Sequence, residues 1–150
     1  MYKRHSIIIS IIGLTSLAAA LFFNLPFKQF AEPALTVNSI SIAVYIAAAS
    51  ALLGSKYSYE LKKTIDPEIN DKTKLGVLAS YLNKAGTVSL ISIIISCMYC
   101  VGFNVEGLVI FKKICNSIAY VCFSLSISFL FLILKLLIAS MVNAANNAHT

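Results

Sequence analysis

The residues most capable of chemistry in this sequence are two histidines, six acidic residues and four cysteines. His5 and His149 stand at opposite ends of the chain, and all six acids lie outside the long apolar runs. An enzyme needs proton-transferring, nucleophilic or metal-binding groups within reach of one another. The sequence contains no glycine-rich nucleotide loop, no HExxH and no GxSxG. We therefore expect a protein that is not an enzyme and that holds no cofactor or metal.

The cysteines suggest redox chemistry only at first sight. Cys97 and Cys100 form a CxxC pair inside an apolar run, where no nearby base would stabilise a thiolate. Cysteines three residues apart on an apolar helix pack as small hydrophobic side chains. Cys100 and Cys115 flank a short loop, so a disulfide between them is possible in an oxidising compartment.

Serines are the remaining polar groups inside the apolar runs. Ion-coupled carriers generally keep an acidic residue at mid-membrane, and this chain has none there. A water-filled pore needs no such acid, since hydroxyl groups can line it once several copies assemble. The candidate lining residues are Ser92, Ser96, Ser124 and Ser128.

The elements that carry these residues are apolar helices. Of the 150 residues, 59% are hydrophobic and only 12% are charged, with a mean hydropathy of +0.85. Eighteen charged side chains cannot cover a soluble domain of this size, which indicates an integral membrane protein. A helix needs about 20 apolar residues to cross a hydrocarbon core. Four runs without a charged residue satisfy this requirement: 6–27, 35–54, 85–103 and 117–134.

The distribution of lysine and arginine predicts the orientation. If the helices alternate in direction, nine basic residues fall on one side and three on the other. The positive-inside rule then places both termini in the cytoplasm of a multi-pass inner-membrane protein. The larger group is Lys3, Arg4, Lys56, Lys62, Lys63, Lys72, Lys74, Lys84 and Lys135; the smaller is Lys28, Lys112 and Lys113.

Four of these cations stand at the ends of the runs and are expected to anchor them at the headgroups: Arg4, Lys56, Lys84 and Lys135. Lys135 lies among leucines, about 31 Å along a helix that starts near Ile114. Its amine can therefore extend to the inner headgroups. Because the positive charge of +6 marks membrane junctions, anionic lipid is its expected counterpart and nucleic acid is not.

Small residues at intervals of four predict where helices meet. Membrane helices associate through close packing and interhelical hydrogen bonds, which small side chains permit. The second run carries such a face at Ser39, Ala43, Ala47 and Ala51, with Gly54 beside it. It can seal the bundle within one chain; because a four-helix bundle is thin, we also expect self-association into a homo-oligomer.

Residues 55–84 form the one charge-rich segment, predicted to be a cytoplasmic helical hairpin extending from the second and third runs. Asp66-Pro67-Glu68 is typical of a helix start, with an N-cap acid followed by proline. Apolar residues at helical spacing on the second arm would pack internally, lie on the membrane or receive a partner. The predicted partner-binding residues are Glu60, Lys62, Lys63, Leu75, Leu78 and Leu82.

These features predict an all-α, single-domain membrane protein with four transmembrane helices. In layout the chain is similar to small bacterial inner-membrane proteins such as colicin-immunity proteins and membrane subunits of phage-defence systems. The resemblance implies a role in toxin immunity or antiviral defence. We expect a membrane sensor or scaffold that engages a cytoplasmic protein through its hairpin. The alternative is an oligomeric pore or a holin-like membrane permeabiliser.

Overall fold

A computed structural model describes residues 2–23, 26–53, 56–69, 72–102 and 109–147. Side-chain surroundings are described for these residues except 52–53, 56–57, 60, 109 and 140–147. Within the described ranges every regular element is a helix, apart from one isolated antiparallel bridge between Ile65 and Thr73. The all-α expectation is confirmed.

Four of the helices are long and apolar enough to cross a membrane. They are α1 (Lys3–Phe23), α2 (Ala31–Leu53), α4 (Lys74–Cys100) and α5 (Val109–Asn147). Two short elements accompany them: the 3-10 helix η1 (Phe27–Phe30), which leads into α2, and α3 (Lys56–Lys63), which follows it.

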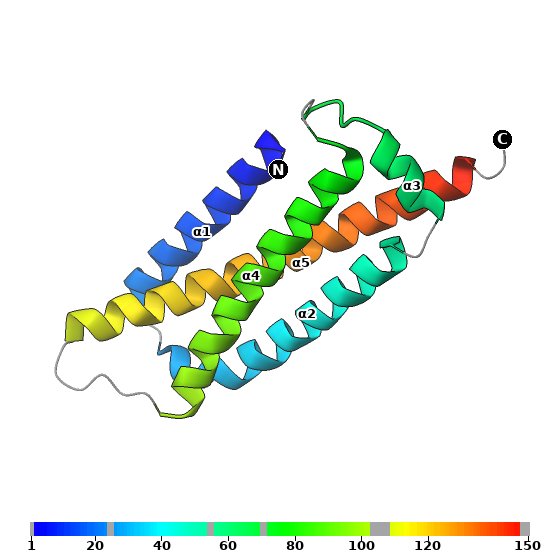
Figure 1. The fold of residues 1–150 in the computed structure, drawn as a ribbon. Coiled ribbons are helices and arrows are strands. Elements are labelled where there is room, and N and C mark those ends of the chain that lie inside the picture. Colours follow the sequence, from blue (N-terminus) through cyan, green and yellow to red (C-terminus); the bar gives the residue numbers. More distant parts are fainter. Residues whose placement is uncertain (1, 24–25, 54–55, 70–71, 103–108, 148–150) are drawn as a thin grey trace.

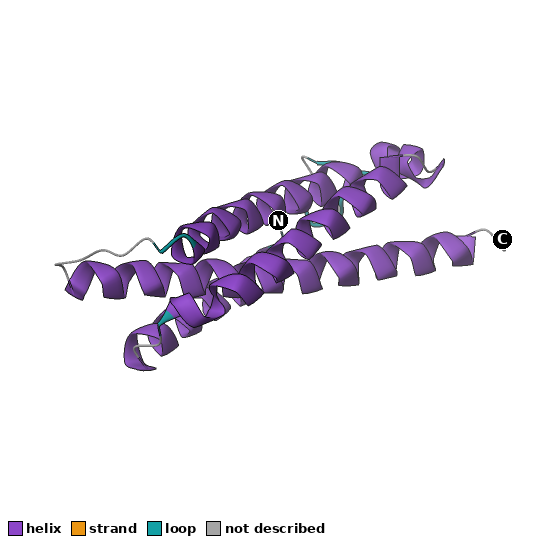
Figure 2. Cartoon of the chain, turned by 90° about the horizontal axis from the view of Figure 1, so that it is seen from below, coloured by secondary structure: helices purple, strands orange, loops and turns teal. Residues whose placement is uncertain are grey.

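The four long helices pack as a bundle (Figure 1). The main pairings are α2 with α4, α1 with α5, and α4 with α5. The start of α1, the segment between α3 and α4, and the far part of α5 gather at one end, here called the loop end. Seen from below, almost the whole described chain is helix (Figure 2).

The opposite end, here called the η1 end, is organised around Phe27. This side chain is fully buried and packs with Ala31, Ala34 and Ala119. Its ring meets the rings of Tyr99 and Tyr120 edge-on, with centroids 5.3 and 5.1 Å apart. The apolar run 6–27 predicts that Phe27 ends the first span, but α1 ends at Phe23. Pro26, which is extended, precedes a separate 3-10 turn.

The predicted helix start at Asp66 is wrong. Helix α4 begins at Lys74, where the Thr73 side chain accepts a hydrogen bond from the Gly76 amide at 3.2 Å. The flanking segments 64–69 and 72–74 are instead joined by three backbone hydrogen bonds, Asp66 N to Lys72 O, Lys72 N to Ile69 O and Lys74 N to Thr64 O. From Lys74, α4 runs to Cys100 without a break at Lys84.

Helix α5 is longer than the span expected at 117–134. It holds 39 residues, about 58 Å at 1.5 Å per residue, so it exceeds a hydrocarbon core of about 30 Å. The part long and apolar enough to cross a membrane is Ile110–Ala139. Lys135 therefore lies near the end of this apolar stretch, and its side chain is exposed.

The outer surface of the bundle is apolar. On α1, Ile7, Ile11 and Leu14 are 59%, 54% and 66% exposed, and on α5 Phe131 is 72% exposed. The centre is built from fewer side chains: Tyr45, Ala85, Phe129 and Ile133. Large aliphatic side chains thus face outward while Asn38 and several serines are buried, a pattern that helices crossing a membrane would show.

Candidate functional site

The most highly connected polar group in the described structure is Asp66, at the loop end. Its carboxylate is 1% exposed and accepts three hydrogen bonds. The Tyr2 hydroxyl donates to Oδ2 at 2.6 Å, while the amides of Glu68 and Ile69 donate to Oδ1 at 2.9 and 3.0 Å. Asp66 therefore shapes the turn that follows it and also ties this turn to the start of α1.

These contacts determine the charge state of the pair. Burial alone would raise the pKa of Asp66, but the hydrogen bonds from Tyr2, Glu68 and Ile69, together with the charge of Lys74, lower it overall. Burial, followed by the hydrogen bond to Asp66, raises the pKa of Tyr2. The pair is thus an ionised carboxylate and a protonated phenol at neutral pH, the arrangement of a charge-assisted hydrogen bond.

Tyr81 of α4 extends this cluster to His5 of α1. The Tyr81 oxygen accepts from the backbone amide of Tyr2 at 2.9 Å and lies 2.8 Å from His5 Nδ1. We assign the single hydroxyl proton of Tyr81 to the His5 bond, which makes Nδ1 the acceptor. The His5 and Tyr81 rings also meet edge-on, with centroids 5.7 Å apart. Tyr2, His5, Asp66 and Tyr81 together are called the Asp66 cluster.

The geometry of the Asp66 cluster suits a structural role, in which hydrogen bonds hold neighbouring segments together. Asp66 and Tyr81 are each only 1% exposed, so a substrate has no direct access to the carboxylate or the central phenol. Among the described residues, no group of three or more histidines, cysteines or acids is placed to hold a metal. The arrangement can hold the loop, α1 and α4 in one geometry.

The predicted apolar stripe of the hairpin lies inside the protein. Leu78 is buried with Leu61 of α3, and Leu75 and Leu82 pack against them. Leu136 and Leu137 of α5 complete this cluster. The stripe is therefore covered by the chain's own helices α3 and α5.

The exposed side of the same segment has a mixed character. Tyr59 is 64% exposed and Ile65 is 63% exposed. The Lys63 ammonium lies 4.4 Å from the centroid of the Tyr59 ring, a cation–π contact. We call these exposed side chains of residues 59–74 the loop surface. It comprises Tyr59, Lys62, Lys63, Thr64, Ile65, Pro67, Glu68, Lys72 and Lys74, while the side chain of Glu60 lies outside the described residues.

Two of the four candidate pore serines bond to neighbouring helices. Ser92 is buried and accepts a hydrogen bond from Asn38 Nδ2 of α2 at 2.8 Å. Ser124 meets Ser16 of α1, with the two oxygens 2.9 Å apart. Ser128 donates to the backbone oxygen of Ser124 at 2.8 Å. Ser92 and Ser124 therefore join helices of one chain, Ser128 bonds within its own helix, and the buried Ser96 hydroxyl has no hydrogen-bond partner among the described residues.

A polar seam thus runs through the bundle, and it is incompletely paired. Ser89 and Ser126 join α4 to α5 with their oxygens 2.6 Å apart. In the part of the chain that the structure describes, Asn38 Oδ1 and Ser96 Oγ are buried without a hydrogen-bond partner. The sequence pattern identifies Ser92 and Ser96 but misses Ser89, Ser126 and Asn38, whose partners lie on other helices and are not evident from neighbours in the chain.

The small-residue face of α2 points away from the bundle. Ser39, Ala43, Ala47 and Ala51 are all exposed, and Gly54 lies outside the described residues. The Ser39 hydroxyl donates to the Leu35 carbonyl of its own helix at 2.8 Å. The buried face of α2 instead carries Ala34, Asn38, Ser41, Tyr45 and Ala48.

The predicted anchors and cysteines are distributed over both ends. Arg4, Lys84 and Lys135 are exposed, and the side chain of Lys56 lies outside the described residues. All four cysteines are free, so Cys100 and Cys115 form no disulfide here. Cys97 and Cys100 are exposed on α4, whereas Cys115 and Cys122 are half-buried on α5.

Comparison of this chain with known protein families, with curated proteins and with solved structures finds no match.

Proposed function

We propose that this chain is a non-enzymatic subunit of a bacterial inner membrane, with four transmembrane helices and both termini in the cytoplasm. It presents the loop surface to a cytoplasmic protein partner and associates with further copies of itself. The main support for a partner surface is that the Asp66 cluster fixes the loop while Tyr59 and Ile65 remain largely exposed, close in sequence to Lys62 and Lys63.

The loop surface suits a partner better than the leucine stripe does. Leu75, Leu78 and Leu82 are engaged by α3 and α5, so a partner could reach them only by opening the protein. Exposed aromatic and aliphatic groups flanked by lysines favour an acidic surface with an apolar centre. The partner is therefore expected to present carboxylates around an apolar contact.

Site-specific photo-crosslinking in native membranes tests this proposal. A photoreactive residue at Ile65 should capture one protein, and Lys62→Glu with Lys63→Glu should abolish that capture. The matched control carries the photoreactive residue at Phe22, which is 84% exposed near the end of α1. The same products at both sites, or capture that persists in the charge-reversed variant, would remove the loop surface from the proposal.

The membrane topology has its own test. The chain should stay in the membrane during alkaline extraction, and tags at both tails should be accessible only from the cytoplasmic side. Tags accessible from opposite sides of the membrane would contradict the proposed orientation. A chain that is monodisperse without detergent would contradict the membrane assignment.

Self-association is supported by the exposed small-residue face of α2, since small side chains allow close approach of a second helix. The detergent-corrected mass of the purified chain should exceed that of one copy, and Ala43→Leu with Ala47→Leu should reduce it. Leucine substitutions at the exposed Thr15 and Ala18 of α1 serve as the control.

An oligomeric pore remains the second proposal, favoured by the unpaired oxygens of Asn38 and Ser96 within the bundle. Because Ser92 and Ser124 are engaged between helices of one chain, the geometry supports the subunit role better. Conductance across liposomes distinguishes the two, since a scaffold leaves the bilayer electrically silent.

A further inference from the structure

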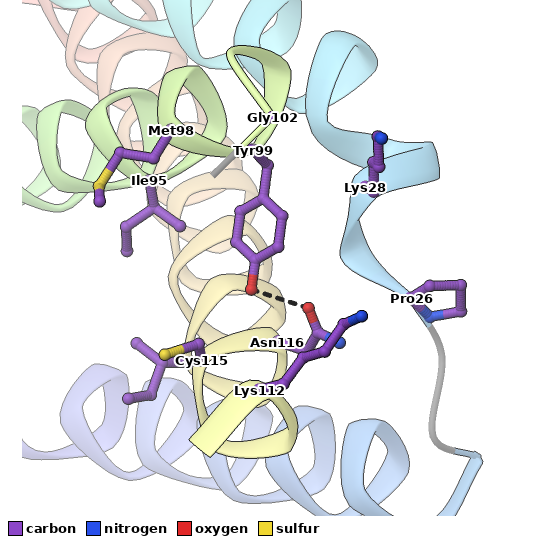
Figure 3. A pocket seen from close by; sticks show the side chains of 10 residues that line it. Pro26, Lys28, Ile95, Met98, Tyr99, Gly102, Lys112, Cys115 and Asn116 are labelled. Carbon is purple, nitrogen blue, oxygen red and sulfur yellow. Dashed lines mark hydrogen bonds between the residues drawn. The ribbon is translucent and has the colours of Figure 1, made fainter. Parts of the chain in front are cut away.

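A pocket opens at the η1 end of the bundle, far from the loop surface. Its volume is about 490 Å³, within the range of small-molecule sites. Residues from η1, the last turns of α4 and the first turns of α5 line it (Figure 3). Its described lining includes no acidic residue: it is formed by Pro26, Lys28, Ile95, Met98, Tyr99, Gly102, Lys112, Cys115, Asn116 and Ile118.

One wall of this η1 pocket presents hydrogen-bond donors. The Tyr99 hydroxyl donates to Asn116 Oδ1 at 2.7 Å, which fixes the amide so that its nitrogen faces elsewhere. The Asn116 amide and the Lys112 ammonium lie on the same stretch of α5 in Figure 3, with Lys28 coming from η1. The Lys112 ammonium and the oriented amide make this wall complementary to an anion, and Lys28 adds a second positive charge from the η1 side of the pocket.

The rest of the pocket is apolar. Ile95, Met98 and Ile118 supply hydrocarbon surface in the same pocket. Met98 and Gly102 also line a second hollow of about 540 Å³ on the outside of α4, together with the apolar Ile94 and Val101. The shared residues make the two hollows neighbours. An aliphatic chain can therefore continue from the pocket along α4.

We propose that the η1 pocket binds an anionic amphiphile with a phosphate-bearing headgroup. The headgroup is held by Lys28, Lys112 and Asn116, and an acyl chain lies over Ile95, Met98 and Ile118. This inference rests on the membrane location proposed above, because the pocket lies where the helix ends would meet lipid headgroups. It is independent of the loop surface and its partner.

The test uses the full-length protein in a nonionic detergent. Native mass spectrometry measures the binding of dioleoyl phosphatidylglycerol, dioleoyl phosphatidylcholine and glycerol phosphate in parallel. Phosphatidylglycerol should bind in preference to phosphatidylcholine, at one copy per chain. A surface lysine contributes about a fivefold gain in affinity for anionic lipid. Lys28→Gln with Lys112→Gln should therefore weaken the binding of phosphatidylglycerol about 25-fold.

Lys113 provides a matched control. It is exposed and adjacent to Lys112 but does not line the pocket, so Lys113→Gln should leave the affinity within about twofold. In a separate variant, Ile118→Trp narrows the apolar part without changing any charge. It should weaken binding of the long-chain lipid, and the exposure of Ile118 makes this substitution compatible with folding.

The outcomes separate the sources of the phosphate. If glycerol phosphate displaces phosphatidylglycerol at an equal concentration, the pocket binds a phosphate ion without need of an acyl chain. That result would overturn the proposal that its ligand is an amphiphile. Equal binding of phosphatidylcholine, or equal losses in the Lys112 and Lys113 variants, would overturn the pocket's selectivity. A chain that needs no detergent would instead refute the membrane proposal, which this binding measurement does not itself probe.

Discussion

The hydrogen bond between Tyr2 and Asp66 gives the sharpest quantitative prediction. Tyr2→Phe removes the phenol that donates to Oδ2 at 2.6 Å, and Asp66→Asn replaces the buried carboxylate with an isosteric amide. Asparagine can still accept from the amides of Glu68 and Ile69 through its single carbonyl oxygen. Comparison of the two single variants with the double variant therefore isolates the charge-assisted bond between Tyr2 and Asp66, while the turn after Asp66 is kept.

The expected size follows from the geometry. A hydrogen bond to a charged group contributes about 1.5–3 kcal/mol, and this carboxylate is 1% exposed. We expect a coupling free energy of about 2 kcal/mol in the double-mutant cycle. Opening of residues 64–74 should therefore become about thirtyfold easier in either single variant, and the double variant should differ little from the singles.

Hydrogen exchange provides the assay. The informative amides are those of Asp66, Lys72 and Lys74, which donate hydrogen bonds that close the loop. Their protection is measured in detergent micelles for the native chain, both single variants and the double variant. Tyr59→Phe is the control, because Tyr59 is 64% exposed and outside the Asp66 cluster. Additive effects, with coupling below about 0.5 kcal/mol, would refute the reasoning.

The same pair predicts a pH dependence. The pKa of Asp66 is lowered from 3.8 in the folded protein, so its stabilisation is complete above that value and is lost as pH falls through the lowered pKa. The pKa of Tyr2 is raised from 10.0, so its stabilisation is complete below pH 10 and is lost as pH rises beyond it. Loop protection should therefore be highest between about pH 4 and 10. Asp66→Asn should remove the acid limb and reduce the basic limb, because the carboxylate contributes, after burial, to the raised pKa of Tyr2.

Three further predictions concern the bundle interior and are measured by reversible unfolding in mixed micelles. Phe27→Ala should destabilise the protein by about 3 kcal/mol, because the ring is fully buried; a loss below about 1 kcal/mol would contradict its role. Ser92→Ala should cost about 1 kcal/mol by unpairing a buried amide, whereas Ser96→Ala, one turn away, should be neutral or stabilising because its hydroxyl is unpartnered. The reverse order would be inconsistent with the polar seam. The Ser89–Ser126 cycle should give a coupling of about 0.6 kcal/mol, and zero coupling would argue against this bond.

The four long helices could be predicted because length and hydropathy are local properties of the sequence. The ends were less predictable. Phe27 continues an apolar run in composition, yet Pro26 separates it from α1 and it becomes core of the η1 end. Asp66 carries a genuine capping signal, and its side chain does accept from the two amides that follow. The chain then closes a loop, so the signal describes a turn and not a helix.

The Asp66 cluster could not be predicted in full. Tyr2 and Asp66 are 64 positions apart, and Tyr2 and Tyr81 are 79 apart, so no spacing rule relates them. The serine faces were visible from their periodicity, but the periodicity does not specify which helix each face meets. Asn38 pairs with Ser92 only because α2 and α4 are neighbours in space.

The pairing of α1 with α5 has a consequence for biogenesis. Helix α1 leaves the ribosome well before α5, which is its principal partner through contacts such as Ser16 with Ser124. At about 5–20 residues per second, more than a hundred residues of translation separate the two for at least several seconds. In a chain inserted as we propose, α1 stays in the lipid during this time without α5 packed against its inner face. Truncation before α5 should therefore leave a first helix available to quality-control proteases.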